Sequence, residues 1–264
     1  MAERAVRLPH TRKPEASVLT SPVRALLWVG AIVVLVALIY LVARDSSMFA
    51  VTRIEVTGAP LPVARQARGA LAFVDGRSLL RLDGRGVVAA LERLPTVYRA
   101  SYDRDFPHTL RIRVVPERPV AVLRRGLESW VVSARGRVIA SVRRGGLATL
   151  PRIWLGRTAV VEIGAILRDP SAVLASRALS SFKHAGLGPR ISFVKAVGGR
   201  LVAGLRTGLE LRFGPPVDLG VKLAVAHAVL PTLAAPSVGG PRYLDVTVPE
   251  RPVAGTDPQV EGRG

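Results

Sequence analysis

An uninterrupted apolar segment near the amino terminus constrains this chain more than any other feature. Residues 25–43, ALLWVGAIVVLVALIYLVA, lie between Arg24 and Arg44 and contain neither a charge nor a proline. As a helix rising about 1.5 Å per residue, the segment would span about 28 Å, close to the thickness of a bilayer's hydrocarbon core. A cleaved signal peptide has a shorter apolar region, of about 7–15 residues, and small residues before its cleavage site. The segment is therefore predicted to be a retained transmembrane helix.

The cations that flank this segment predict how it crosses the membrane. Residues 1–24 form a basic tail in which Arg and Lys outnumber the acids, whereas beyond the segment Asp45 and Glu55 offset Arg44 and Arg53. Cations accumulate on the cytoplasmic side of a membrane span. We therefore expect a single-pass protein with its amino terminus in the cytoplasm and its carboxyl-terminal domains outside, in a periplasmic or wall-facing space. The tail itself has too few apolar residues to fold alone.

The composition narrows the possible chemistry. The chain contains no cysteine, which excludes disulfides, thiolate zinc sites and cysteine nucleophiles. Its net charge of +19 comes almost entirely from arginine, and such a balance suits nucleic acid, anionic lipid headgroups or an acidic wall polymer. The arginines are scattered rather than clustered. Because a domain outside the membrane meets no nucleic acid, a nucleic-acid partner is not expected.

Residues 49–118 follow the order strand, helix, helix, strand, strand. VTRIEVTGAP alternates as a strand and ends at a turn, and the first helix is expected to start near Pro62. Asp83 is a good N-cap for the second helix, which Pro95 stops. TVYRASYD and TLRIRVV then read as two strands around a turn. A three-stranded sheet with both helices on one face would bury both apolar sets.

Residues 119–254 predict a mixed β-domain with a few helices, so that the whole chain is of the α+β class. Short apolar runs up to Trp154 predict a meander of strands, and Asp169 is the N-cap of a helix that Gly186 stops. Residues 255–264 are expected to be a disordered tail. The remaining expected elements are strands in ISFVKAV, LVAGL and LELRF, a helix over residues 216–230, and a last strand from Tyr243 to Val248.

Residues suited to catalysis are sparse. None of the histidines has metal-ligand spacing, and no nucleophile elbow, P-loop or dinucleotide fingerprint is present. Asp103 and Asp105 lie beside Arg104 and His108 in a turn, where a solvated capping role is expected. Lys222 would be a nucleophile only with a depressed pKa, and we expect its stem to pack while its ammonium reaches water. We therefore expect no enzyme, no cofactor, no metal and no small-molecule substrate.

Several segments resemble those of the bacterial FtsQ/DivIB family of cell division proteins. FAVTRIEVTG after the apolar segment and FPHTLRIRVVPERPVAVL resemble the family's POTRA domain. WVVSARGRVIA, LPRIWLG, GLELRFGPPVDLGVKLAVAHAVL with Lys222, and YLDVTVPERPVA resemble its β-domain, although Ser133 stands where the family commonly has aspartate. The resemblance covers about residues 25–254. The POTRA positions that match are Pro107, Leu110, Ile112, Val114, Glu117, Pro119 and Ala121.

The resemblance implies a non-enzymatic scaffold at the division septum. The β-domain would bind a segment of an FtsB-like or DivIC-like partner at its last strand, an FtsL-like protein would join that partner, and the assembly would control septal peptidoglycan synthesis. Two alternatives are a POTRA-containing outer-membrane assembly or secretion factor and a membrane-anchored enzyme of the cell envelope. The first would require a barrel of many alternating strands, and the second a convergent pocket of titratable groups.

The last strand is the predicted contact, because an exposed strand edge offers unpaired backbone groups to a partner strand. Pro241 and Pro249 bracket it and limit its length. In the alternative interpretation, the strand is central and paired on both sides, and the interface lies elsewhere. The predicted partner-binding residues are Tyr243, Leu244, Asp245, Val246, Thr247 and Val248, and the predicted neighbouring strand is Leu209, Glu210, Leu211, Arg212 and Phe213.

Overall fold

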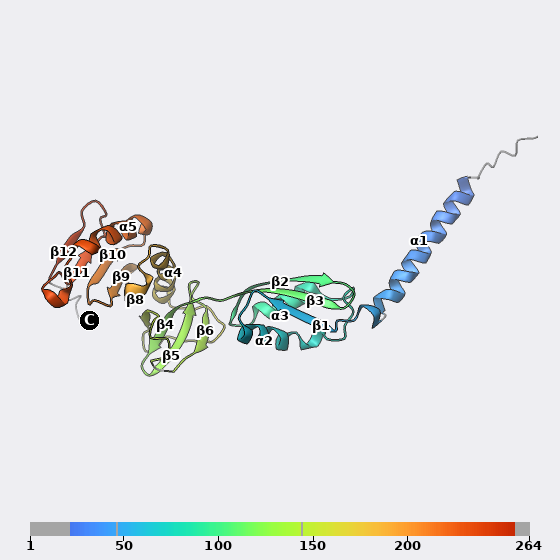
Figure 1. Cartoon of the computed structure of the whole chain (residues 1–264), viewed down its shortest axis with the longest axis horizontal. Coiled ribbons are helices and arrows are strands. Elements are labelled where there is room, and N and C mark those ends of the chain that lie inside the picture. The colour runs from blue at the N-terminus through green and yellow to red at the C-terminus, as the bar shows by residue number, and fades with distance from the viewer. Residues whose placement is uncertain (1–21, 46, 144, 257–264) are drawn as a thin grey trace, which may run out of the picture.

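The computed structural model describes residues 22–45, 47–143 and 145–256. A long helix, α1 (Pro22–Asp45), leads into two folded domains that follow one another along the molecule (Figure 1). The window Ala25–Val42 has a mean hydropathy of 2.9 and is fully exposed, so α1 is long and apolar enough to cross a membrane. Most of the predicted basic tail, and the predicted disordered tail beyond residue 256, lie outside the described residues.

The first domain has the predicted order of elements. Its three-stranded sheet has the order β1-β3-β2, with β1 parallel to β3 and β2 antiparallel to it. Helices α2 and α3 pack against this sheet and close one hydrophobic core with it. The elements are β1 (Arg53–Thr57), α2 (Leu61–Ala70), α3 (Gly84–Glu92), β2 (Val97–Asp105) and β3 (Thr109–Pro116), with short 3-10 turns at Ser47–Phe49 and Ala72–Val74.

The local signals in the sequence explain these helices. The Asp83 carboxylate accepts a hydrogen bond from the Arg85 backbone N–H at 3.0 Å and so caps α3. Ala67 of α2 and Val87 and Leu91 of α3 are fully buried against the sheet. The periodic apolar face of each helix therefore faces the core, as expected.

The second domain is built on one nine-stranded sheet of order β12-β11-β10-β9-β8-β7-β4-β5-β6. Two helices, α4 (Pro170–His184) and α5 (Leu219–Val229), pack against it. The strands are β4 (Pro119–Arg125), β5 (Glu128–Ser133), β6 (Val138–Ser141), β7 (Arg152–Trp154), β8 (Ile191–Val197), β9 (Arg200–Leu205), β10 (Glu210–Gly214), β11 (Tyr243–Asp245) and β12 (Val253–Gly255). Short 3-10 turns lie at Gly188–Arg190, Leu230–Thr232 and Pro236–Val238.

Only part of this sheet is the predicted meander. Strands β4, β5 and β6 follow one another antiparallel, but β7 lies on the other side of β4 and runs parallel to it. A parallel neighbour needs a crossover rather than a tight turn, and residues 142–151 provide that connection. The sheet therefore continues from β7 toward β12 on the opposite side from β6.

The two helices cover one face of the sheet and leave the other face without a helix. α4 contacts β4, β7 and β8, and α5 contacts β10. The Asp169 carboxylate accepts from the N–H groups of Ser171 and Ala172, which fixes the start of α4 as predicted. The segment Leu219–Val238 is also apolar, with a mean hydropathy of 1.4, but Leu223 and Ala226 of α5 belong to the domain core. We therefore assign it to the folded domain.

A buried guanidinium joins the two domains. Arg137, which immediately precedes β6, is 9% exposed. Its Nε donates to the Gly164 carbonyl at 2.9 Å, within the second domain. Its Nη2 donates to the carbonyls of Glu92 and Arg93 at 3.0 and 3.1 Å, and its Nη1 to that of Val97 at 3.3 Å. The second domain therefore caps the carboxyl end of α3 with a cation, which the helix dipole favours.

A second contact stands beside this one. The buried Glu117 carboxylate pairs with the Arg135 guanidinium, which also lies over the Tyr98 ring at 4.9 Å from its centroid. Burial is the main cause that lowers the pKa of Arg137, and the nearby positive charge of Arg135 lowers it further. The side chains at the junction thus belong to both domains.

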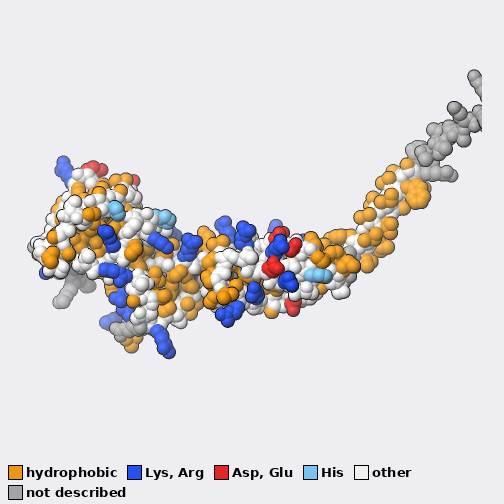
Figure 2. Space-filling view, in the orientation of Figure 1, with side chains coloured by type: hydrophobic (Ala, Val, Ile, Leu, Met, Phe, Trp, Pro, Cys, Tyr) orange, Lys and Arg blue, Asp and Glu red, His pale blue; other side chains and the backbone are white. Residues whose placement is uncertain are grey.

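Cationic side chains are spread over both domains. Figure 2 shows Lys and Arg along the visible face of each domain, whereas Asp and Glu gather mainly over the first. On this face, the Arg and Lys side chains are therefore scattered over the surface, as they are along the sequence.

Candidate partner-binding surface

The predicted last strand is shorter than expected and does not lie at the edge of the sheet. β11 contains only Tyr243–Asp245; it pairs with β10 in parallel and with β12 antiparallel. The Val246 N–H still donates to the Arg212 carbonyl, at 2.8 Å, but Val248 is past the strand and 52% exposed. The prediction of a free edge at Tyr243–Val248 is therefore wrong. The chain turns after residue 246 and returns, so that a further strand covers that edge.

The edge belongs instead to β12, which the sequence interpretation missed. Within the described residues, no strand pairs with the outer side of β12. β6, at the opposite end of the sheet, is flanked by a loop: the Val138 N–H donates to the Ala165 carbonyl, and the Val138 carbonyl accepts from Gly164. An open edge of this kind is what a partner strand can extend. The sequence signal for β12, the apolar pair before Gly255, is too short to predict a strand.

A hollow of about 300 Å³ adjoins this edge, and we call it the terminal hollow. Tyr243 and Asp245 of β11 line the hollow, and they point to the opposite face of the sheet from Leu244, which belongs to the core. The hollow therefore lies on the face that carries no helix. Four of the predicted contact residues line this hollow: Tyr243, Asp245, Thr247 and Val248. The hollow is lined by Arg212, Tyr243, Asp245, Thr247, Val248, Arg251 and Val253.

Tyr243 extends from β11 across the edge strand. A Cβ atom added at Gly255 would lie 2.5 Å from the Tyr243 phenol oxygen, so only glycine at position 255 leaves room for this ring. The Arg212 guanidinium lies over the ring at 4.0 Å from its centroid and donates to Glu210 at 3.0 Å. Asp245 accepts from the Thr247 N–H at 2.8 Å, which holds the turn after β11.

The hollow offers hydrogen-bond donors. Nη2 of Arg212 is buried and has no hydrogen-bond partner among the described residues. The Arg251 side chain is exposed and takes part in no ion pair among the described residues. Because a buried donor without an acceptor is costly, the hollow favours a ligand that brings a carbonyl or carboxylate oxygen to Arg212.

Lys222 has a different role from the expected one. Its residue is only 5% exposed, and its Nζ donates to the carbonyls of Phe213 and Pro215 at 2.9 and 2.8 Å. The expectation that its ammonium reaches water is therefore wrong. The lysine ties the end of β10 to helix α5 and holds the sheet beside the terminal hollow.

The acids considered for catalysis make local contacts. Asp105 pairs with Arg111 at 2.7 Å, and Asp103 accepts from the Arg104 N–H at 2.9 Å. His108 lies 3.3 Å from the Ala50 carbonyl through Nδ1. These contacts order the turn between β2 and β3. Within the described parts of the chain, no group of three or more His, Asp or Glu side chains could hold a metal ion.

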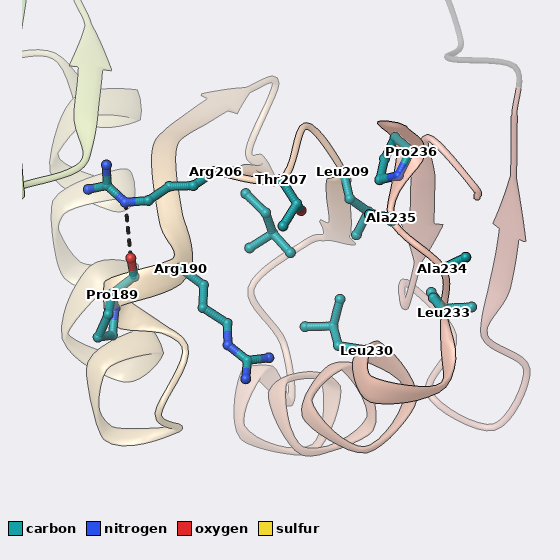
Figure 3. Close-up of a pocket in the computed structure, with 11 residues that line it drawn as sticks. Pro189, Arg190, Arg206, Thr207, Leu209, Leu230, Leu233, Ala234, Ala235 and Pro236 are labelled. Atoms are coloured by element: carbon teal, nitrogen blue, oxygen red, sulfur yellow. Dashed lines mark hydrogen bonds between the residues drawn. The ribbon is translucent and has the colours of Figure 1, made fainter. Parts of the chain in front are cut away.

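An apolar pocket of about 330 Å³ lies between the β9–β10 turn and the segment after α5 (Figure 3). Leu205 and Leu209 form its buried part. Leu230 and Leu233 line its helical side. Arg206 is engaged with backbone, since its Nε donates to the Pro189 carbonyl at 3.0 Å. No acid or histidine is among the described residues that line it, so the pocket brings together no acid–base pair.

Comparison with known proteins agrees with this architecture. Residues 49–117 match the family described as "POTRA domain, FtsQ-type". A relative described as "Cell division protein FtsQ", from Corynebacterium glutamicum, is 30% identical over 111 residues, which cover 42% of this chain and 50% of the relative. Residues 49–117 are therefore similar to an FtsQ-type POTRA domain.

The match is limited in length. The chain spans about half the length of the FtsQ relative that it matches. The FtsQ-type POTRA match ends at residue 117, before β4 begins.

Proposed function

We propose that this protein is an FtsQ-like, non-enzymatic scaffold of the division septum. α1 crosses the cell membrane with its amino terminus in the cytoplasm, and both folded domains lie outside. The apolar, fully exposed window Ala25–Val42 supports the crossing, and the basic residues before it support the orientation. The contacts of the acids and of Lys222 support a role in binding rather than in catalysis.

The second domain binds a segment of an FtsB-like or DivIC-like partner. The partner strand extends the sheet at β12 and places alternate side chains in the terminal hollow. The open edge of β12 beside that hollow is the observation that carries this proposal. Tyr243, Asp245 and Thr247 take part through their side chains, and Arg212 receives an oxygen acceptor from the partner.

An FtsL-like protein joins through that partner, and the assembly controls septal peptidoglycan synthesis. Since α1 and β12 lie at opposite ends of the described chain (Figure 1), the contact is held away from the membrane. Loss of the protein is then expected to block division, which depletion followed by microscopy measures. Cells that continue to divide normally would contradict the proposal.

A matched pair of proline substitutions tests the edge. Ala254→Pro places a proline in β12, and Ala140→Pro places one in β6 at the other end of the same sheet. Proline removes a backbone donor and blocks strand addition. We expect Ala254→Pro to abolish capture of the FtsB-like partner by the full chain in a pull-down, and Ala140→Pro to leave it intact.

Gly255→Val provides a second readout that leaves the backbone donors in place. Its side chain would displace the Tyr243 ring, since even a Cβ atom approaches the phenol oxygen to 2.5 Å. Capture should weaken while the circular dichroism spectrum stays unchanged. Full capture by both the Ala254→Pro and the Gly255→Val variants would exclude β12 as the docking edge.

A further inference from the structure

An aromatic pair, an exposed Trp154 and a half-buried Phe193, lies on the helix-free face of the sheet, away from the terminal strands. Trp154 of β7 is 55% exposed, and its ring packs edge-on against Phe193 of β8 with centroids 5.3 Å apart. The Phe193 ring in turn lies over Gly204 of β9, where an added Cβ atom would approach the ring to 2.1 Å. The missing side chain at position 204 therefore leaves the space that the Phe193 ring occupies, and any larger residue there would displace the ring.

Three cations share this face with the aromatic pair. In the strand register, Arg124 of β4 lies beside Trp154, and Arg152 of β7 lies beside Phe193. Lys195 follows Phe193 on the same face two residues later in β8. Within the described residues, none of these three cations takes part in an ion pair or a side-chain hydrogen bond. Their charges are therefore available to a ligand.

A buried hydroxyl without a partner lies next to the arginines. Ser129 of β5 is 5% exposed, and its Oγ has no hydrogen-bond partner among the described residues. It lines a hollow of about 10 Å³ together with Arg124 and Arg152. That space admits about one water molecule or one ligand oxygen. A buried hydroxyl normally has such a partner, so this is an independent sign of a polar ligand.

We propose that this basic–aromatic face, formed by Arg124, Arg152, Trp154, Phe193 and Lys195, binds an anionic polysaccharide of the cell envelope. The exposed indole accommodates the apolar face of a sugar ring, as exposed aromatic rings accept flat ligand rings in other polyanion sites. The guanidinium groups bind carboxylates in bidentate geometry. The inference adds a ligand to the proposed scaffold and relies on it only for the placement of the domain outside the membrane.

Charge and shape argue against two other occupants. A second copy of the chain would bring like charges together on this face. A protein anchor side chain typically fills a pocket, whereas the only hollow described among these residues holds about 10 Å³. A sugar polymer that carries carboxylates can stack one C–H face of a ring on the indole, and it needs neither a pocket nor an acidic protein surface.

Three probes of matched chemistry test the proposal on the full chain in nanodiscs of zwitterionic lipid, by isothermal titration calorimetry. Oligogalacturonate has both sugar rings and carboxylates. Its methyl-esterified form keeps the rings and lacks the charge, and polyglutamate keeps the charge and lacks the rings. We expect oligogalacturonate to bind at least about tenfold more tightly than either comparator, since one charge-assisted contact is worth about that factor.

Variants then assign the binding to this face. Trp154→Ala, and Arg124→Gln combined with Arg152→Gln, should each weaken oligogalacturonate binding about tenfold, whereas Trp154→Phe should restore most of the affinity lost in Trp154→Ala. Arg177→Gln, which removes an exposed arginine from α4, is the matched control and should change nothing. All variants should keep the wild-type thermal unfolding profile and full capture of the partner at β12.

Several results would overturn the proposal. Absence of oligogalacturonate binding, equal binding of polyglutamate, or an equal effect of Arg177→Gln would each remove the role of the face. Tighter binding of a single-stranded oligothymidylate through Trp154 would assign the face to nucleic acid instead. Because partner capture is measured separately, a failure here leaves the proposed docking edge untouched, and the reverse also holds.

Discussion

Replacing Arg137 by alanine tests whether one side chain holds the two domains in a fixed orientation. Arg137 comes from the second domain, yet three of its four hydrogen bonds go to backbone carbonyls of the first. Two of those carbonyls lie at the carboxyl end of α3. Alanine removes the donors and leaves these three carbonyls without the guanidinium.

The expected magnitude follows from these contacts. A hydrogen bond to a charged group contributes about 1.5–3 kcal/mol, and three such bonds cross the junction. The contributions are not additive, and the substitution also removes the cost of burying the guanidinium, a cost seen in the lowered pKa of Arg137. We therefore expect the docking of the two domains to lose about 3 kcal/mol of free energy. This loss raises the ratio of separated to docked domains about a hundredfold.

Distance measurements between spin labels report the docking directly. Because the chain has no cysteine, Arg85→Cys on α3 and Arg177→Cys on α4 give two unique labelling sites, both exposed. In nanodiscs, Arg137→Ala should broaden a narrow distance distribution. Arg137→Lys, which keeps the charge but loses the planar fork, should broaden it partly.

Arg168→Ala is the matched control, because its side chain is 81% exposed and makes only a 4.0 Å ion pair with Glu162. It should leave the distribution unchanged. If Arg137→Ala gives the same narrow distribution as the control, other contacts such as the Glu117–Arg135 pair hold the junction, and the reasoning from the Arg137 hydrogen bonds is refuted.

Three smaller predictions concern the second domain. Lys222→Met keeps the stem but leaves two buried carbonyls unpaired, so denaturant titration should show a loss of about 2 kcal/mol; an unchanged midpoint would contradict the buried contact. Asp169→Ala removes an N-cap that accepts from two N–H groups, and thermal unfolding should show a loss of about 1 kcal/mol. Gly204→Ala should displace the Phe193 ring and lower the free energy of unfolding by about 1–3 kcal/mol. A shift of the Trp154 fluorescence should accompany the displacement. An unchanged spectrum would refute the packing of Phe193 over Gly204.

The first domain was predictable because its signals are local. Asp83 caps α3 as the sequence indicates, and the alternation in TLRIRVV places Leu110, Ile112 and Val114 in the core. The α+β class and the helices of the second domain follow from the same kind of pattern. Each of these signals depends on residues that are close together in the sequence, so the prediction does not require knowledge of how distant segments pair.

The candidate site was only partly predictable. The sequence interpretation placed β10 beside the last predicted strand, and the two do pair. It could not show that the chain turns after Val246 and returns as β12, because three residues of strand carry no reliable periodicity. It also missed Arg212 and Arg251 as a pair, since they come from segments far apart in the sequence.

By itself, the sequence determined the apolar helix, the charge, the absence of cysteine and the order of local elements, because composition and short-range periodicity carry these properties. The tertiary structure alone decided which strand ends the sheet, where Lys222 places its ammonium, and how Arg137 bridges two domains. These features depend on pairings between distant segments, and burial decides which polar groups must find partners. The exposed face around Trp154 likewise arises only when strands β4, β7 and β8 lie side by side.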